Sequence, residues 1–373
     1  RLMRRRVLER QVQIVRAVLY VERFEQDAFG AGLDLAGDPG LDACGGGGTH
    51  GSSGLLQSRS TLIFSGRGVR QGAVLDAVPD LPDLAPTVLA ALGAPTTGGI
   101  GPDGIYDDGL YLLRQDGRVL WDVLTAEPCD SPRHVVIVLL DGALASEVNH
   151  LALDASPEVD LPVLRALAAG GAVFRYGAVS NFPSVSAPGH MTSGTGLWSG
   201  HHGLIANAFY KRSTQTSLNP YALIEDPQDA ILHPEKVLAL YDEAVAPGIE
   251  TLAQAAHRAF GAWDAATGTG AFVAVVNEAT FVGSDWNTLD YFTGGASFAP
   301  PGRGDTAEFA DSLAVTQIET LLQDEAYPIP TVLQVSFLST DDAGEQDGPH
   351  SDALRAAMVT ADGHISRIRE LYA

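Results

Sequence analysis

The sequence predicts an α/β protein with a doubly wound, mostly parallel sheet sandwiched between helices. Short, continuously apolar runs such as "HVVIVLLDG" (134–142) are typical of strands that are buried on both faces. These runs alternate with amphipathic segments of helical length, such as 248–261 and 351–373. The chain has 373 residues, of which 45% are hydrophobic, so it is long enough to enclose a large core.

For the first part of the chain, residues 1–128, we predict few helices and strands. Pro86 suits the first turn of a helix, and Gly93 suits its end. Our predictions here are an amphipathic helix at 1–24, a Gly-rich loop at 28–58, a buried strand at 60–66, a compact helix at 84–94 and a turn-rich segment at 95–118.

A Pro-containing linker at 129–133 separates this part from a more regular one. We therefore divide the chain into a portion at 1–128, the linker, and a portion at 134–373. In the second portion we predict strands at 134–142 and 270–279, a strand within 330–351 that runs into an acidic loop, and helices at 162–172, 248–261 and 351–373.

Composition excludes several classes of partner. The formal net charge is −23, which argues against binding a nucleic-acid duplex or an anionic membrane surface. Two cysteines, Cys44 and Cys129, are too few for a disulfide framework or a cysteine-based zinc site. The sequence contains no run of 18 apolar residues, so we predict no membrane span. No signal peptide is visible. Oligomeric state is left open.

Polar residues at predicted strand ends mark the candidate site. Asp141 closes the strand at 134–142, and Asp341 lies just after the strand within 330–351. In open α/β sheets, chemistry sits at the carboxyl ends of the strands. We predict that the hydroxyl-rich stretch "NFPSVSAPGHMTSGTG" (181–196) is a loop. Carboxylates near such a loop suggest divalent metals that activate a Ser or Thr nucleophile. Two alternatives stay open: Asp141 as a helix cap, and the serines as ordinary turn residues.

Three motifs, in this order along the chain, resemble the alkaline phosphatase superfamily. They are "HVVIVLLDGA", "FPSVSAPGHMTSGTGLWSGHHGLIAN" and "VSFLSTDDAGEQDGPHS", and they cover most of 133–373. The residues of these motifs are most similar to those of the type I phosphodiesterase/nucleotide pyrophosphatase branch. The resemblance implies an alkaline phosphatase-like fold, a Thr or Ser that attacks phosphorus, and two metal ions that flank the attacking oxygen.

The resemblance also assigns residues to the catalytic centre. It makes Ser186 the nucleophile and also a metal ligand, Asp141 a ligand of the metal that holds Ser186, and Asp341 a ligand of the other metal. Glu345 stands where the family has a second-metal His. His350, five residues further on, is the alternative ligand.

The substrate-binding residues implied by the resemblance are Gly189 and Asn207. Gly189 stands where the family has an Asn, so a side-chain donor to the phosphoryl oxygen is lost there. For His190 and His202 we predict packing or hydrogen bonding rather than metal ligation.

The segments occur in an unusual order. Residues 46–94 resemble the C-terminal portion of the same family, in which a Thr-His-Gly supplies the last metal ligand, here His50. The family's Asp-His-Gly motif is absent from the chain. We interpret the chain as a fragment of a longer tandem protein or as a circular permutant, and we expect its two portions to share one sheet.

The function implied is a metal-dependent phosphoric ester hydrolase of the phosphodiesterase/nucleotide pyrophosphatase type. It would act on a small-molecule phosphoester with two divalent ions, zinc foremost and Mg²⁺, Mn²⁺ or Ca²⁺ as alternatives. A second hypothesis is an impaired relative that acts as a binding or scaffold module. A third is a phosphomonoester, phosphonate or sulfate ester hydrolase on the same fold. The resemblance favours a location outside the cytoplasm.

Overall fold

A five-stranded sheet with all strands parallel forms the centre of the molecule. The computed structural model describes residues 14–21, 58–125, 134–143, 145–154, 159–219, 239, 241, 243–278, 280–293 and 306–373. The strand order is β1-β7-β14-β12-β13, and all neighbouring pairs are parallel. This confirms the predicted fold class. The strands span Ile14–Val21 (β1), His134–Leu140 (β7), Val332–Phe337 (β14), Val273–Val276 (β12) and Trp286–Asn287 (β13).

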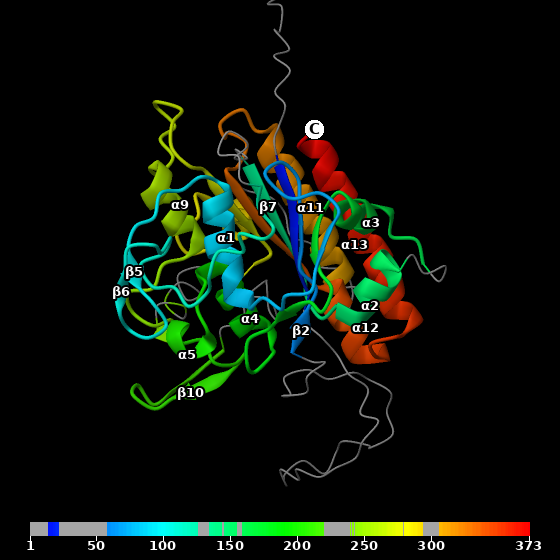
Figure 1. The fold of residues 1–373 in the computed structure, drawn as a ribbon, viewed down its shortest axis with the longest axis horizontal. Helices are drawn as coiled ribbons and strands as arrows, with labels where there is room; N and C mark the ends of the chain where they lie inside the picture. The colour runs from blue at the N-terminus through cyan, green and yellow to red at the C-terminus, as the bar shows by residue number, and fades with distance from the viewer. Residues whose placement is uncertain are drawn as a thin grey trace, which may run out of the picture.

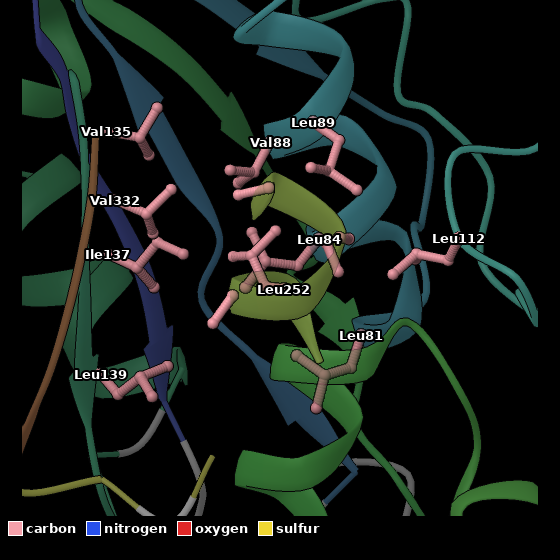
Figure 2. Packing of buried hydrophobic residues seen from close by; sticks show 14 of the residues in the cluster. Leu81, Leu84, Val88, Leu89, Leu112, Val135, Ile137, Leu139, Leu252 and Val332 are labelled. Carbon is pink, nitrogen blue, oxygen red and sulfur yellow. The ribbon is translucent and has the colours of Figure 1, made fainter. Parts of the chain in front are cut away.

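The two faces of the sheet pack into separate cores. Side chains alternate between the faces of a strand, so a strand covered on both sides must be apolar throughout. In β7, Val135, Ile137 and Leu139 belong to one buried cluster, and the residues between them belong to the other. Figure 2 shows the first of these clusters, in which β7 faces Leu84 and Leu252. The uninterrupted apolar run at 134–140 is therefore explained by burial on both faces.

Helices cover both faces (Figure 1). Local sequence sets their ends. In the helix at Leu252–Phe260, for example, the Thr251 side chain caps the start by accepting the backbone N–H of Gln254, and Gly261 marks the end. On one face lie α1 (Leu84–Ala91), α4 (Ser186–Thr195) and α9 (Leu252–Phe260). On the other lie α3 (Pro162–Ala169), α11 (Thr306–Gln323), α12 (Ser339–Asp347) and α13 (Asp352–Leu371). Shorter helices are η1 (Leu81–Asp83), α2 (Ala145–Val148), η3 (Asn149–Leu153), α5 (Ser199–His202) and α10 (Thr288–Thr293).

Strands from both portions of the chain pair with one another. The central sheet joins β1 to β7, as expected for portions that share a sheet. Two smaller sheets do the same, because β2 pairs with β9, and both β3 and β4 pair with β8. These strands are β2 (Arg59–Ser60), β3 (Ile63–Ser65), β4 (Ala73–Leu75), β8 (Gly171–Phe174) and β9 (Ala178–Val179). Two short antiparallel pairs are β5 (Gly99–Ile100) with β6 (Tyr106–Asp107) and β10 (Phe209–Lys211) with β11 (Thr216–Leu218).

Three local predictions are wrong. Residues 14–21, predicted as part of a helix, form strand β1, because pairing along β7 outweighs the local helical pattern. The rest of 1–24 lies outside the described residues. The predicted acidic loop after β14 is helix α12, and most of the hydroxyl-rich stretch is helix α4.

The division into portions at 1–128 and 134–373 stays a prediction. None of the helices in the described part of the chain is both long enough and apolar enough to cross a lipid bilayer.

Candidate active site

The carboxyl ends of three neighbouring strands carry the polar residues of the site. Asp141 directly follows β7, Glu278 lies two residues after β12, and α12 begins two residues after β14. Because β14 lies between β7 and β12, these ends meet at one edge of the sheet.

Ser186 and Asp141 are brought together as the sequence predicts. Ser186 is the first residue of α4, and its Oγ donates to Asp141 Oδ1 over 3.2 Å. Both residues are only 1% exposed. The Asp141 backbone is held on both sides: its N–H donates to Phe337 O over 2.9 Å, and its carbonyl accepts from the Thr340 hydroxyl. The backbone of Asp141 is therefore anchored by the end of β14 and by α12, besides its own strand.

Asn207 lies beside the N-terminus of α4. Its Oδ1 accepts the backbone N–H of Ala187 over 2.9 Å, which leaves the amide nitrogen of the half-buried side chain as the donor available to a substrate. Gly189 is buried, and its N–H donates to Val185 O over 3.0 Å within the helix. The backbone of Gly189 thus supplies no spare donor to replace the missing Asn side chain.

His190 lies one turn after Ser186 on α4 and connects two carboxylates. Its Nδ1 is 2.9 Å from Glu278 Oε1, and its Nε2 is 3.6 Å from Asp141 Oδ2. All three side chains are fully buried. Burial alone lowers the pKa of His190, but the charges of Glu278 and Asp141 and the hydrogen bond with Glu278 raise that pKa well above its ordinary value. As predicted, His190 is a hydrogen-bonding residue.

Glu278 is a residue of the site that our sequence analysis missed. Its only signal is its place two residues after an apolar run, which is similar to the signal that identified Asp141. No motif of the family pointed to it.

His202 connects α5 to α4. Its Nδ1 accepts from the backbone N–H of Leu204 over 3.1 Å, so its Nε2 carries the proton and donates to Thr192 Oγ1 over 3.0 Å. Burial, with a smaller contribution from the nearby His201, lowers the pKa of His202 to about 3, although a hydrogen bond with the backbone of Pro188 opposes the shift. The neutral ring is thus a structural link, as predicted.

The candidate ligands of the second metal lie on α12. Asp341 is half-buried and Glu345 is exposed, and one helical turn separates them. His350, the alternative ligand, is instead 2.7 Å from Glu147 Oε2 through its Nδ1. His50 lies outside the described residues, so its predicted role stays a prediction.

Asp311 holds the start of α12 from α11. Its carboxylate accepts the backbone N–H groups of Leu338 and Ser339 at 2.7 and 3.0 Å. Burial raises the pKa of Asp311 to about 7, although hydrogen bonds from the Ser339 and Leu338 groups oppose the rise; the charge of Asp141 adds the smallest contribution to it. Asp311 thus holds the start of α12 with a carboxyl group that is itself buried.

The donor set fits a metal ion only in part. The Ser186 hydroxyl adjoins the Asp141 carboxylate, so two oxygen donors of the predicted set lie together. Within the described ranges, however, no three His, Cys, Asp or Glu side chains gather in a way that could hold a metal ion. The structure thus brings together Asp141 and Ser186, but not the full predicted ligand set.

Aromatic residues near the site divide between core and surface. Phe281 and Trp286 are buried in the core, 5% and 6% exposed, whereas Tyr210 is 58% exposed. Phe182, four residues before Ser186, is 67% exposed. Exposed aromatic side chains thus flank the site residues in sequence.

A family model described as type I phosphodiesterase / nucleotide pyrophosphatase matches residues 135–373. A search of curated proteins found none that matches. Among solved structures, murine ectonucleotide pyrophosphatase / phosphodiesterase 5 is 16% identical, with 64% of this chain and 52% of that chain covered and a TM-score of 0.38. An inactive variant of the same murine protein in complex with AMP is also 16% identical, with 50% and 40% covered and a TM-score of 0.30. The chain thus spans about half the length of these proteins or less.

Proposed function

The chain belongs to the type I phosphodiesterase/nucleotide pyrophosphatase family, and from this premise we propose that it carries part of a metal-dependent phosphoric ester hydrolase with Ser186 as the nucleophile. The observation that supports the proposal most is the buried contact between Ser186 Oγ and Asp141 Oδ1 at 3.2 Å. It joins the motif serine to the motif aspartate, which are 45 residues apart in sequence.

The chain's own residues would perform three tasks. Asp141 accepts the hydrogen bond of the Ser186 hydroxyl and so fixes the direction of its lone pairs. Ser186 Oγ would attack phosphorus, forming a phosphoserine as the bond to the leaving oxygen breaks, and water would then hydrolyse the phosphoserine. The amide nitrogen of Asn207 and the positive end of α4 would face the phosphoryl oxygens.

Metal ions would be held by Asp141 and Ser186 on one side and by Asp341, with Glu345, on the other. When bound, such ions neutralise phosphoryl oxygens and favour the deprotonated serine. These donors are all oxygen atoms, which shifts the preference from zinc toward Mg²⁺, Mn²⁺ or Ca²⁺.

The test is hydrolysis of an aryl phosphodiester by the whole chain, with and without added divalent ions. We expect Ser186→Ala to lower kcat/KM by at least ~10³-fold and a chelator to abolish activity. A matched control is Ser184→Ala, which removes a buried hydroxyl of the same turn and should leave activity in place. Full activity of Ser186→Ala would refute the nucleophile. Acid-quenched reactions should contain a phosphorylated peptide with Ser186.

A second candidate function is a binding or scaffold module. The incomplete ligand set among the described residues and the engaged N–H of Gly189 favour it. Metal analysis separates the two proposals: a chain that binds about two divalent ions supports the hydrolase, and a chain that binds none supports the scaffold.

A further inference from the structure

A buried bridge crosses the carboxyl edge of the sheet from β12 to β7. Glu278 and Asp141 belong to strand ends that are separated by β14. His190, which comes from α4, contacts both carboxylates, and none of the three side chains is exposed to solvent. A helix above the sheet thus connects two strands that do not touch each other.

The two contacts of the His190 ring differ in kind. The distance from Nδ1 to Glu278 Oε1, 2.9 Å, is that of a good hydrogen bond. The distance from Nε2 to Asp141 Oδ2, 3.6 Å, is too long for one but is within the range of an ion pair. Glu278 therefore sets the orientation of the ring, and the ring in turn presents Nε2 to Asp141.

The two oxygens of Asp141 consequently have different neighbours. Oδ2 faces His190, while Oδ1 accepts from the Ser186 hydroxyl. A carboxylate held at one oxygen only can rotate about its last bond, which would move the other oxygen away from its partner. The contact with His190 opposes that rotation.

We propose that Glu278 is a positioning residue of the reaction centre, which acts through His190 to keep Asp141 Oδ1 aimed at Ser186. This inference rests on the proposed function, because it concerns the same nucleophile. It adds a residue outside the three motifs and assigns His190 a task other than metal ligation. Such outer contacts matter because reacting groups must be held to within ~0.5 Å.

The experiment compares Glu278→Gln and Glu278→Ala with the unaltered chain. Loss of an outer partner of this kind costs ~10–100-fold in activity or metal affinity. We expect Glu278→Ala to lower kcat by that factor with KM nearly unchanged. Glu278→Gln, which keeps an oxygen for Nδ1 of His190, should fall between the two.

Thr280→Val is the matched control. Thr280 is buried two residues away, and its Oγ1 accepts from Gln334 Nε2 over 2.9 Å, so its loss also disrupts a buried hydrogen bond. If Glu278 had a merely structural role, its variants would, like Thr280→Val, contain a smaller fraction of folded protein. Their kcat per folded molecule would then equal that of the unaltered chain. That result, or kcat of Glu278→Ala within ~2-fold of the unaltered chain, would overturn the proposal.

Metal binding gives a readout that does not need turnover. In calorimetric titration with Mn²⁺ or Zn²⁺, Glu278→Ala should bind ~10–100-fold more weakly and Thr280→Val normally. Equal affinity of Glu278→Ala and the unaltered chain would count against the positioning role. If the unaltered chain binds metal but hydrolyses nothing, the proposed function fails while this comparison still decides the role of Glu278. A crystal structure of the zinc form with the ion bonded to His190 Nε2 would also overturn the proposed positioning role, since the ring would then be a metal ligand.

Discussion

Lowering the pH should loosen the helix that carries Ser186, because His202 is buried in its neutral form. The ring connects α5 to α4, with Nδ1 accepting from Leu204 and Nε2 donating to Thr192. A second proton on Nδ1 would place two N–H groups against each other in a buried site. Burial, with a smaller effect of His201, accordingly lowers the pKa of His202 from 6.5 to about 3.

The size and sign of the effect follow from the difference in proton binding. Below pH 6.5 the unfolded chain protonates this histidine while the folded chain does not, so acid favours unfolding. The free energy of unfolding is unaffected above pH 6.5 and decreases by about 1.4 kcal/mol per pH unit down to the folded pKa. Between pH 7 and pH 5 the loss is about 2 kcal/mol, a large share of a typical total of ~5–15 kcal/mol.

Urea unfolding of the whole chain and of His202→Asn at pH 7, 6 and 5 measures this contribution. An Asn side-chain oxygen can still accept the N–H of Leu204, and it does not titrate. The variant should be less stable at pH 7, and the gap should narrow by about 2 kcal/mol by pH 5. Titration of all other groups cancels in the difference between the two proteins. A gap that changes by less than about 0.5 kcal/mol would refute the reasoning.

Two further predictions concern packing and buried charge. Gly194→Ala would place a Cβ 2.6 Å from Thr280 Cγ2, so we expect a loss of about 1–3 kcal/mol in urea unfolding, whereas Gly200→Ala, with nothing within 4 Å, should be neutral or stabilising. Stability that is unchanged in Gly194→Ala would contradict this contact. Glu147→Gln weakens buried bonds from Arg355 and His350 and should cost about 1–3 kcal/mol. Glu319→Gln, in a more exposed pair with Arg367, should cost less than about 1 kcal/mol. Equal losses in these two variants would show that burial does not matter here.

The strands and helices that the sequence predicted well share one property: their local pattern and their tertiary role agree. The run at 134–140 is apolar at every position because both faces of β7 are covered. The helix at 252–260 carries its own start and stop in Thr251 and Gly261. Residues 14–21 failed as a prediction because an edge position beside β7, rather than local periodicity, makes them a strand.

The candidate site was predicted from its motifs. The predicted ligand set stays incomplete where this chain departs from the motifs of the family or lacks them. Asp141 and Ser186 meet as expected, and Asn207 adjoins the same helix terminus. The roles of Asp341 and Glu345 as ligands stay predictions, as does that of His50.

By itself, the sequence determined the α/β class, the family and the pair Asp141 and Ser186, because these depend on local patterns and on the order of short motifs. Only the tertiary structure decided that Glu278 reaches Asp141 through His190, and that His350 turns to Glu147. The contact of Glu278 with His190 joins residues 88 positions apart and that of His350 with Glu147 residues 203 positions apart, so no local pattern encodes them. They arise because parallel strands bring their carboxyl ends to one edge, where a helix from elsewhere in the chain can bridge them.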